Sequence, residues 1–251
     1  MNIFINILVA FICFIFGYLF GSIPTSVIIG KVKFHQDPRD FGSGNAGATN
    51  AGRLWGKKWR VIIIILDGLK TFLPFLLSFI ILTYVKIDNG QPLIATTEHY
   101  YISDGVDYTI KWPVYWLSVV GTVLGHCFPL FAGFRGGKGA ASFIGIGCWA
   151  SWLCGFIPFI SYLIIKGKTK YVSLAVLLSG LICLAFGWIY TLLWFLKVIP
   201  VELYWLPTYG PLFNIPLYFP ATMTICYALV VSRHHGNIKR LIDGNERKTL
   251  N

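Results

Sequence analysis

Charged residues are scarce in this sequence. They make up 12% of its 251 residues, whereas 56% are hydrophobic, and a soluble domain is nearer one quarter charged. The apolar residues also come in long blocks, which indicates an integral membrane protein rather than a soluble one. Because no soluble insertion or low-complexity linker is present, we expect one polytopic domain over residues 1–251. The candidate membrane spans are Ile3–Gly30, Val61–Val85, Pro113–Ala132, Ala140–Ile165, Tyr171–Lys197 and Pro211–Ser232.

The sequence also lacks the patterns of metal and redox chemistry. None of the six cysteines forms a CxxC pair, and all lie in or beside apolar segments, where a thiol packs as a small hydrophobe. The histidines show no metal-ligand spacing, and no pair of carboxylates suited to metal-dependent hydrolysis stands out. We therefore expect neither a metal nor a cofactor.

Positive charge is unevenly spread along the chain. All but three of the 21 Lys and Arg residues fall into clusters, at Lys31–Arg39, Arg53–Arg60 with Lys70 nearby, Arg135/Lys138, Lys166–Lys170 and Arg233–Lys248. The positive-inside rule assigns such clusters to the cytoplasm. It predicts an external N-terminus, a cytoplasmic C-terminus and outer loops at Lys86–Lys111 and about Val198–Gly210. A basic collar beside lipid headgroups accounts for the net charge of +11, so we expect membrane lipids and no nucleic acid as partners.

This topology constrains the segment Gly139–Ile165. Basic clusters flank it on both sides, so it must cross the membrane and return. Its length is short for two full spans of about 20 residues each. We therefore predict two short helices divided near Ser151 or Gly155, which brings the total to seven membrane segments.

Three polar islands interrupt the apolar chain on the predicted inner face. They are GSGNAGATNAGR (Gly42–Arg53), GHCFPLFAGFRGGKGAA (Gly125–Ala141) and RHHGNIKRLIDGNERK (Arg233–Lys248). In the first island, glycines permit positive φ, so successive amides can point inward and bind an anion. A helix beginning near Ala48 would add N-terminal amides. Alternatives for this island alone are a flexible loop or a small-residue helix contact.

The second and third islands carry further cations. GGKG places Lys138 among glycines, but no Ser or Thr follows it, and the spacing of a Walker A loop is absent; the alternative is a lysine that snorkels to the interface. The third island has the pattern of a basic amphipathic helix, which could also lie on anionic lipid. His234 and Asn237 are three residues apart, so they would share one helix face.

Together these islands resemble the bacterial acyl-phosphate glycerol-3-phosphate acyltransferases of the PlsY family. The matching segments are GSGNAGATN with Arg53, GHCFPLFAGFRGGKGAA, RHHGNIKRL, GYLFGSIPTS, LDGLK and KYVSLA. The resemblance covers most of the chain in the same order. It implies a seven-helix membrane enzyme of the bacterial plasma membrane, with a cytoplasmic active site. The implied reaction converts acyl phosphate and sn-glycerol 3-phosphate into lysophosphatidic acid and inorganic phosphate.

The resemblance also assigns roles to residues. It implies an acyl-phosphate site made of Ser43, Gly44, Asn45, Gly47, Ala48, Thr49 and Asn50. It implies glycerol-3-phosphate contacts and catalytic residues at Arg53, Lys138, His234 and Asn237, with Ser173 as a further substrate contact. Asp67 and Lys70 are expected to support the loops. The chain departs from the family pattern at Ala46, Arg135 and His235.

Acyl phosphate is already activated, so catalysis needs positioning and charge stabilisation more than a nucleophilic residue. His234, Asp67 and a substrate phosphate are all candidates for the proton acceptor. The pattern His-x4-Asp of other acyltransferases occurs at His99–Asp104, but in a predicted outer loop. Two other functions stay open on sequence: a transporter of organic phosphates, although the repeated halves typical of transporters are not evident, and a structural or lipid-sensing protein. The sequence does not predict an oligomeric state.

Overall fold

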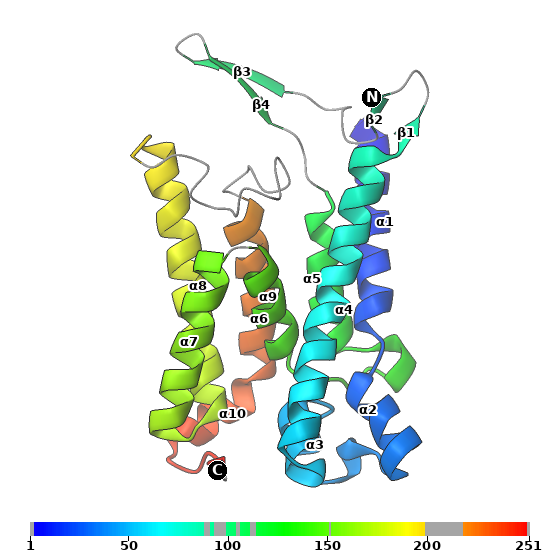
Figure 1. The fold of residues 1–251 in the computed structure, drawn as a ribbon, viewed down its shortest axis with the longest axis vertical. Coiled ribbons are helices and arrows are strands. Elements are labelled where there is room, and N and C mark those ends of the chain that lie inside the picture. Colours follow the sequence, from blue (N-terminus) through cyan, green and yellow to red (C-terminus); the bar gives the residue numbers. More distant parts are fainter. Residues whose placement is uncertain are drawn as a thin grey trace.

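The computed structural model describes residues 3–87, 91–92, 99–103, 106–110, 114–150, 152–198 and 218–249. Helices make up most of this part of the chain, and the longer ones run along the long axis of the molecule (Figure 1). The α-helices are α1 (Ile3–Gly21), α2 (Thr25–Ile29), α3 (Ala48–Trp55), α4 (Lys57–Tyr84), α5 (Trp116–Cys127), α6 (Ala140–Ala150), α7 (Trp152–Thr169), α8 (Val172–Phe195), α9 (Tyr218–Arg233) and α10 (His235–Ile242). Shorter helical turns are η1 (Gly30–Phe34), η2 (Pro38–Asp40) and η3 (Leu130–Ala132).

Three helical stretches among the described residues are long and apolar enough to cross a membrane. They are Asn6–Phe34, Lys57–Leu82 and Val172–Leu193, and a shorter apolar stretch covers Trp116–Ala132. Large hydrophobic side chains point outward from these helices, including Phe11, Ile65 and Leu181, which are each more than half exposed. An apolar exterior is typical of a lipid-facing bundle.

Helices α1 and α5 approach each other closely because glycines line their contact. A Cβ at Gly17 would lie 1.9 Å from the Ser118 carbonyl oxygen, and a Cβ at Gly121 would lie 2.1 Å from that of Phe14. Thr122 Oγ1 also donates a hydrogen bond to the Gly17 carbonyl oxygen over 3.1 Å. Small residues such as these glycines permit close contact between membrane helices.

The predicted division of the fourth span is confirmed. Helix α6 ends at Ala150 and α7 begins at Trp152, and the first predicted position, Ser151, lies outside the described residues. The two helices have 11 and 18 residues, and they pack closely because Gly155 lies against Cys148, where a Cβ would be only 2.3 Å from the Cys148 Cα.

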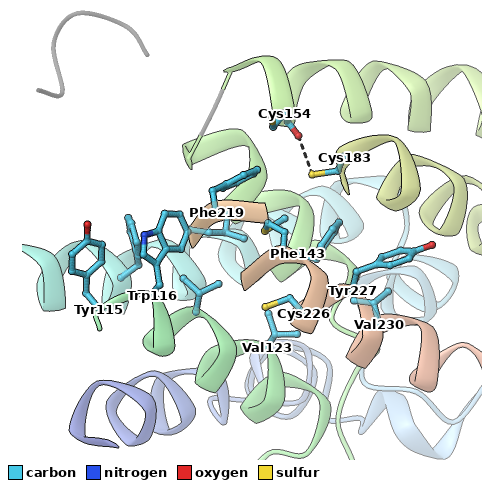
Figure 2. Close-up of a cluster of buried hydrophobic side chains, with 14 of the residues drawn as sticks. Tyr115, Trp116, Val123, Phe143, Cys154, Cys183, Phe219, Cys226, Tyr227 and Val230 are labelled. Carbon is cyan, nitrogen blue, oxygen red and sulfur yellow. Dashed lines mark hydrogen bonds between the residues drawn. The ribbon is translucent and has the colours of Figure 1, made fainter. Parts of the chain in front are cut away.

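A buried aromatic and aliphatic cluster joins helices α5, α6 and α9 (Figure 2). Trp116 and Val123 of α5, Phe143 of α6, and Phe219 and Val230 of α9 are all at most 5% exposed. The six cysteines are free, and all except Cys148 are buried. The five buried cysteines belong to the hydrophobic core, as expected of packed small hydrophobes.

The first predicted outer loop contains strands that the all-α prediction did not include. Strands β1 (Lys86–Ile87) and β2 (Gln91–Pro92) form one antiparallel pair, and β3 (His99–Ser103) and β4 (Val106–Ile110) form another, with His99 opposite Ile110. These hairpins lie at the end of the molecule opposite α3 and α10 (Figure 1). His99 is therefore far from the polar islands, and Asp104 lies outside the described residues. Most of the second predicted outer loop, and the first residues of the last predicted span, also lie outside them.

Candidate active site

Residues of all three polar islands line one cavity of about 510 Å³. Its lining includes residues of α3 and α10, which both lie at the lower end of the molecule in Figure 1. Eleven of the twelve residues predicted for the site line it: Ser43, Asn45, Gly47, Ala48, Thr49, Asn50, Arg53, Lys138, Ser173, His234 and Asn237. Gly44 does not. Its φ of +66° instead turns the loop, and its amide donates to the Phe41 carbonyl oxygen over 3.0 Å.

The first island forms a turn that leads directly into a helix. Gly42 and Gly44 both have positive φ, at 62° and 66°, a conformation that favours glycine. Helix α3 begins at Ala48, as predicted, and its N-cap Gly47 supplies no side chain to cap it. The first amides of a helix have no intrahelical acceptor, so the Ala48 and Thr49 amides are open to an anion at the cavity wall.

Asn50 shapes this loop instead of offering its side chain to a ligand. Its Nδ2 donates to the carbonyl oxygens of Pro38 over 2.6 Å and Phe41 over 3.0 Å, and its Oδ1 accepts from the Ser43 amide over 3.0 Å. The residue is 2% exposed. The resemblance implied a direct phosphoryl contact, whereas these bonds commit both ends of the amide to the backbone.

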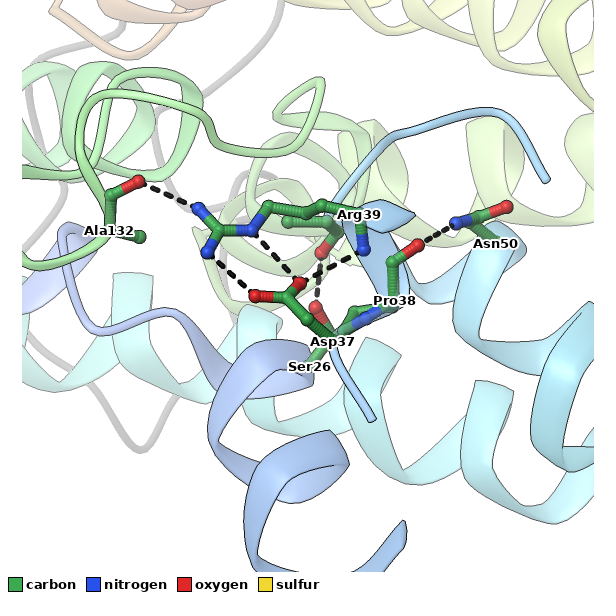
Figure 3. A network of polar contacts seen from close by, with 7 residues as sticks. Ser26, Asp37, Pro38, Arg39, Asn50 and Ala132 are labelled. Atoms are coloured by element: carbon green, nitrogen blue, oxygen red, sulfur yellow. Dashed lines mark hydrogen bonds and ion pairs between the residues drawn. The ribbon is translucent and has the colours of Figure 1, made fainter. Parts of the chain in front are cut away.

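A polar network that was not predicted from the sequence connects the first loop to the second (Figure 3). Arg39 forms a bidentate contact with Asp37, whose shorter arm is 2.7 Å, and its Nη1 donates to the Ala132 carbonyl oxygen over 2.7 Å. The Arg39 hydrogen bond lowers the pKa of Asp37 despite partial burial. A charged pair close to the first island is the only sequence signal that could have indicated it.

Asp67 of α4 lies beneath both loops and is 2% exposed. Its Oδ1 is 2.9 Å from Lys70 Nζ, accepts from Thr25 Oγ1 over 3.0 Å and is 3.6 Å from His126 Nδ1. Lys70 Nζ also donates to the Ile23 carbonyl oxygen over 3.0 Å. That Asp67 and Lys70 support the loops stays a prediction, because their side chains bond Thr25 and the Ile23 carbonyl group, which precede the first loop.

Both loops connect to this cluster. On the first loop, Ser26 Oγ donates to the Ala46 carbonyl oxygen over 2.5 Å, one residue after the Thr25 that Asp67 holds. On the second loop, the Gly137 amide donates to the His126 carbonyl oxygen over 3.0 Å, next to Lys138. The cluster thus connects to both loops through residues that neighbour Thr25 or include His126.

Lys138 and Asn237 meet at the cavity, and Glu246 joins them. Lys138 Nζ donates to Asn237 Oδ1. Asn237 Nδ2 and Ser173 Oγ donate to Glu246 Oε1 over 2.6 and 2.7 Å. Arg240 Nε donates to Glu246 Oε2 over 2.8 Å. Burial lowers the pKa of Lys138 to about 8, and the carboxylate of Glu246 opposes this shift.

His234 has a defined tautomer in this site. Its Nδ1 is 2.7 Å from the Val230 carbonyl oxygen, and a carbonyl can only accept, so Nδ1 carries the proton. Burial lowers the pKa of His234 to about 4, so the ring is neutral near pH 7 and Nε2 is a hydrogen-bond acceptor.

Another part of the cavity wall is apolar. Ile64 of α4, Ile144 of α6, Phe159 and Tyr162 of α7 and Val176 of α8 line it. A cavity with amides and cations at one end and hydrocarbon along its wall fits an anionic amphiphile. Fold and site thus define a helical membrane protein that binds phosphate-bearing lipids or lipid precursors.

Known proteins are similar to this chain over most of its length. A family profile described as glycerol-3-phosphate acyltransferase matches residues 11–244. Proteins named glycerol-3-phosphate acyltransferase from Mycoplasmopsis agalactiae and Thermotoga petrophila are each 34% identical; the first match covers 99% of this chain and 97% of the relative, and the second covers 93% of each.

A crystal structure of PlsY (YgiH), an integral membrane glycerol 3-phosphate acyltransferase in its glycerol 3-phosphate form, is 30% identical. It aligns with a TM-score of 0.69 over 96% of both chains. The form with lysophosphatidic acid gives a TM-score of 0.67 at 29% identity, over 96% of this chain and 95% of that one. The chain belongs to the glycerol-3-phosphate acyltransferase family, of the PlsY type.

Proposed function

We propose that the protein transfers a fatty acyl group from acyl phosphate to sn-glycerol 3-phosphate, which gives lysophosphatidic acid and inorganic phosphate. The observation that carries this proposal is the single cavity in which open helix amides, Arg53, Lys138, His234 and Asn237 meet an apolar wall. Such a cavity can hold two phosphates and one acyl chain at once. Relatives named for glycerol-3-phosphate acylation support the acceptor.

The two substrates divide the cavity between them. The Ser43–Thr49 turn and the start of α3 hold the phosphoryl group of acyl phosphate, and its chain lies along Ile64, Ile144 and Phe159. Arg53, Lys138, Ser173, His234 and Asn237 contact glycerol 3-phosphate. Holding two anions close together makes the transfer effectively unimolecular.

In the reaction, the glycerol hydroxyl attacks the acyl carbonyl carbon, an ester C–O bond forms, and the bond from the carbonyl carbon to the phosphate oxygen breaks. His234 Nε2 accepts a hydrogen bond from the hydroxyl and orients it. His234 is a poor proton acceptor because its pKa is about 4. Asp67 is also a poor acceptor, because its carboxylate is already bonded to Lys70 and Thr25. The departing phosphate, which would otherwise leave as a trianion, is the stronger base, so the hydroxyl proton passes to it. Amides and cations stabilise its charge.

The same proposal includes the membrane topology of the chain. The chain has seven membrane segments, the N-terminus outside, and the site on the cytoplasmic face of a bacterial plasma membrane. Support comes from the basic clusters and from Figure 1, where α10 and the hairpins lie at opposite ends.

The choice of acyl donor tests the proposed function. Membranes that carry the protein should form lysophosphatidic acid from glycerol 3-phosphate with acyl phosphate as donor, and not with acyl-CoA. Activity with acyl-CoA alone would contradict the donor assignment. Movement of glycerol 3-phosphate across the membrane without turnover would favour a transporter.

A further inference from the structure

The segment that follows α10 returns to the cavity. We call residues 245–249 the strap. Gly244, with a φ of +71°, turns the chain before it. The Asn245 amide donates to the Arg240 carbonyl oxygen over 2.7 Å. Glu246 and Arg247 then line the cavity.

Both sides of the cavity anchor the strap. On one side, the Thr249 amide and Oγ1 donate to the Lys170 carbonyl oxygen over 2.8 and 3.0 Å, and the Lys248 ammonium lies 5.7 Å from the centre of the Tyr171 ring. On the other side, Arg247 Nη1 donates to the Gly42 carbonyl oxygen over 3.4 Å. The strap thus joins the α7–α8 turn to the first loop.

Within the strap, Arg247 carries a positive charge that has no counter-ion among the described residues. The carboxylate of its neighbour Glu246 pairs with Arg240, and no carboxylate in the described part of the chain forms an ion pair with Arg247. Arg53 lines the same cavity, and burial and then the charge of Arg247 lower the pKa of Arg53. Two unpaired guanidinium groups at one cavity wall form a site for an anion that each can bind through paired hydrogen bonds.

The position of Arg247 along the strap indicates which anion it binds. Glu246 bonds Ser173 and Asn237, and Arg247, the next residue, lines the cavity together with Arg53. Ser173, Asn237 and Arg53 are all glycerol-3-phosphate contacts in the proposed function. We propose that Arg247 is a further binding residue for the phosphate of glycerol 3-phosphate, delivered by the strap. This inference rests on the proposed function.

Kinetics of the reconstituted full-length protein test this role. With acyl phosphate saturating, Arg247→Ala should raise the KM for glycerol 3-phosphate by about tenfold, because one charge-assisted contact is lost. Its kcat and its KM for acyl phosphate should stay within about twofold of wild type. Arg247→Lys keeps the charge and should recover most of the affinity.

Lys239→Ala is the matched control. It removes one exposed cation from the same terminal region, outside the cavity lining, so its KM should not change. An unchanged KM in Arg247→Ala would overturn the inference, and so would a lower kcat at constant KM, which is the mark of a structural role. An equal rise of KM in Lys239→Ala would also overturn it, because it would assign the effect to net charge. If the wild type itself makes no lysophosphatidic acid, the proposed function fails instead.

Discussion

At the scale of single residues, two cations that line the cavity, Arg53 and Lys138, have different surroundings. The guanidinium of Arg53 has no hydrogen-bond or ion-pair partner in the described part of the chain, whereas the ammonium of Lys138 donates to Asn237 Oδ1. Arg53→Ala and Lys138→Ala should each lower kcat/KM by about a hundredfold or more, the usual effect of removing one group that stabilises developing charge. Arg135→Ala, in the same loop as Lys138 but outside the cavity lining, is the control and should stay near wild type. Wild-type rates in both site variants would refute the assignment.

The lowered pKa of Lys138 also predicts that kcat/KM depends on pH. Its pKa is about 8 because burial disfavours the ammonium form, and only this form attracts a phosphate. The value of kcat/KM for glycerol 3-phosphate should therefore be highest below pH 8 and fall as the pH rises through it. Lys138→Arg should remove this fall, since a guanidinium stays charged. Identical profiles for the two proteins would show that another group titrates.

Sequence reasoning placed most site residues in the cavity but erred on particular side chains. Asn50 lies in a matching motif, yet a motif cannot tell whether an amide points to a ligand or to the Pro38 and Phe41 carbonyl groups. Glu246 was missed because it lies nine residues beyond Asn237, after a positive-φ turn at Gly244. Helical periodicity carries no information across such a turn.

At the scale of elements, the buried Asp67–Lys70 pair connects α4 to the loops. Asp67→Asn would leave Lys70 charged and uncompensated, which should destabilise the fold by about 3 kcal/mol. Thermal unfolding in detergent measures this loss. Asp67→Asn with Lys70→Met removes both charges and should recover part of the stability. If the single and double variants unfold alike, the ion pair is not the cause.

The contact between α1 and α5 allows a second test at this scale. Gly121→Ala places a methyl group 2.1 Å from the Phe14 carbonyl oxygen, so the helices must separate and the midpoint of thermal unfolding should drop. Gly167→Ala in α7 is the matched control, because no atom lies within 4 Å of its Cβ position. It should be neutral or slightly stabilising. Equal effects would show that helix propensity, not contact, is being measured.

Elements were predictable where one physical signal dominated. Basic clusters on both sides of Gly139–Ile165 predicted that this segment divides into two helices, as α6 and α7 show. The hairpin β3–β4 had a signal that was not used: runs of aromatic and β-branched residues on either side of Asp104-Gly105, a favoured hairpin dipeptide. The contact of Arg39 with Ala132 joins residues 93 apart, and no local pattern contains such a distance.

At the scale of the whole molecule, the cavity and hairpins lie at opposite ends, which predicts opposite sides of the membrane. Single cysteines at Asn45 and Lys239, in a background without the native cysteines, should react with an impermeant thiol reagent only from the cytoplasmic side. A cysteine at His99 should react only from outside. Labelling of all three from one side would contradict the proposed topology.

The central claim is that one cavity joins acyl phosphate to glycerol 3-phosphate. The most direct measurement is the yield of both products from the purified protein in liposomes, with the phosphoryl group of acyl phosphate labelled. The account predicts one inorganic phosphate for each lysophosphatidic acid, with both products dependent on glycerol 3-phosphate. Phosphate released without lysophosphatidic acid would contradict it, as would the absence of either product.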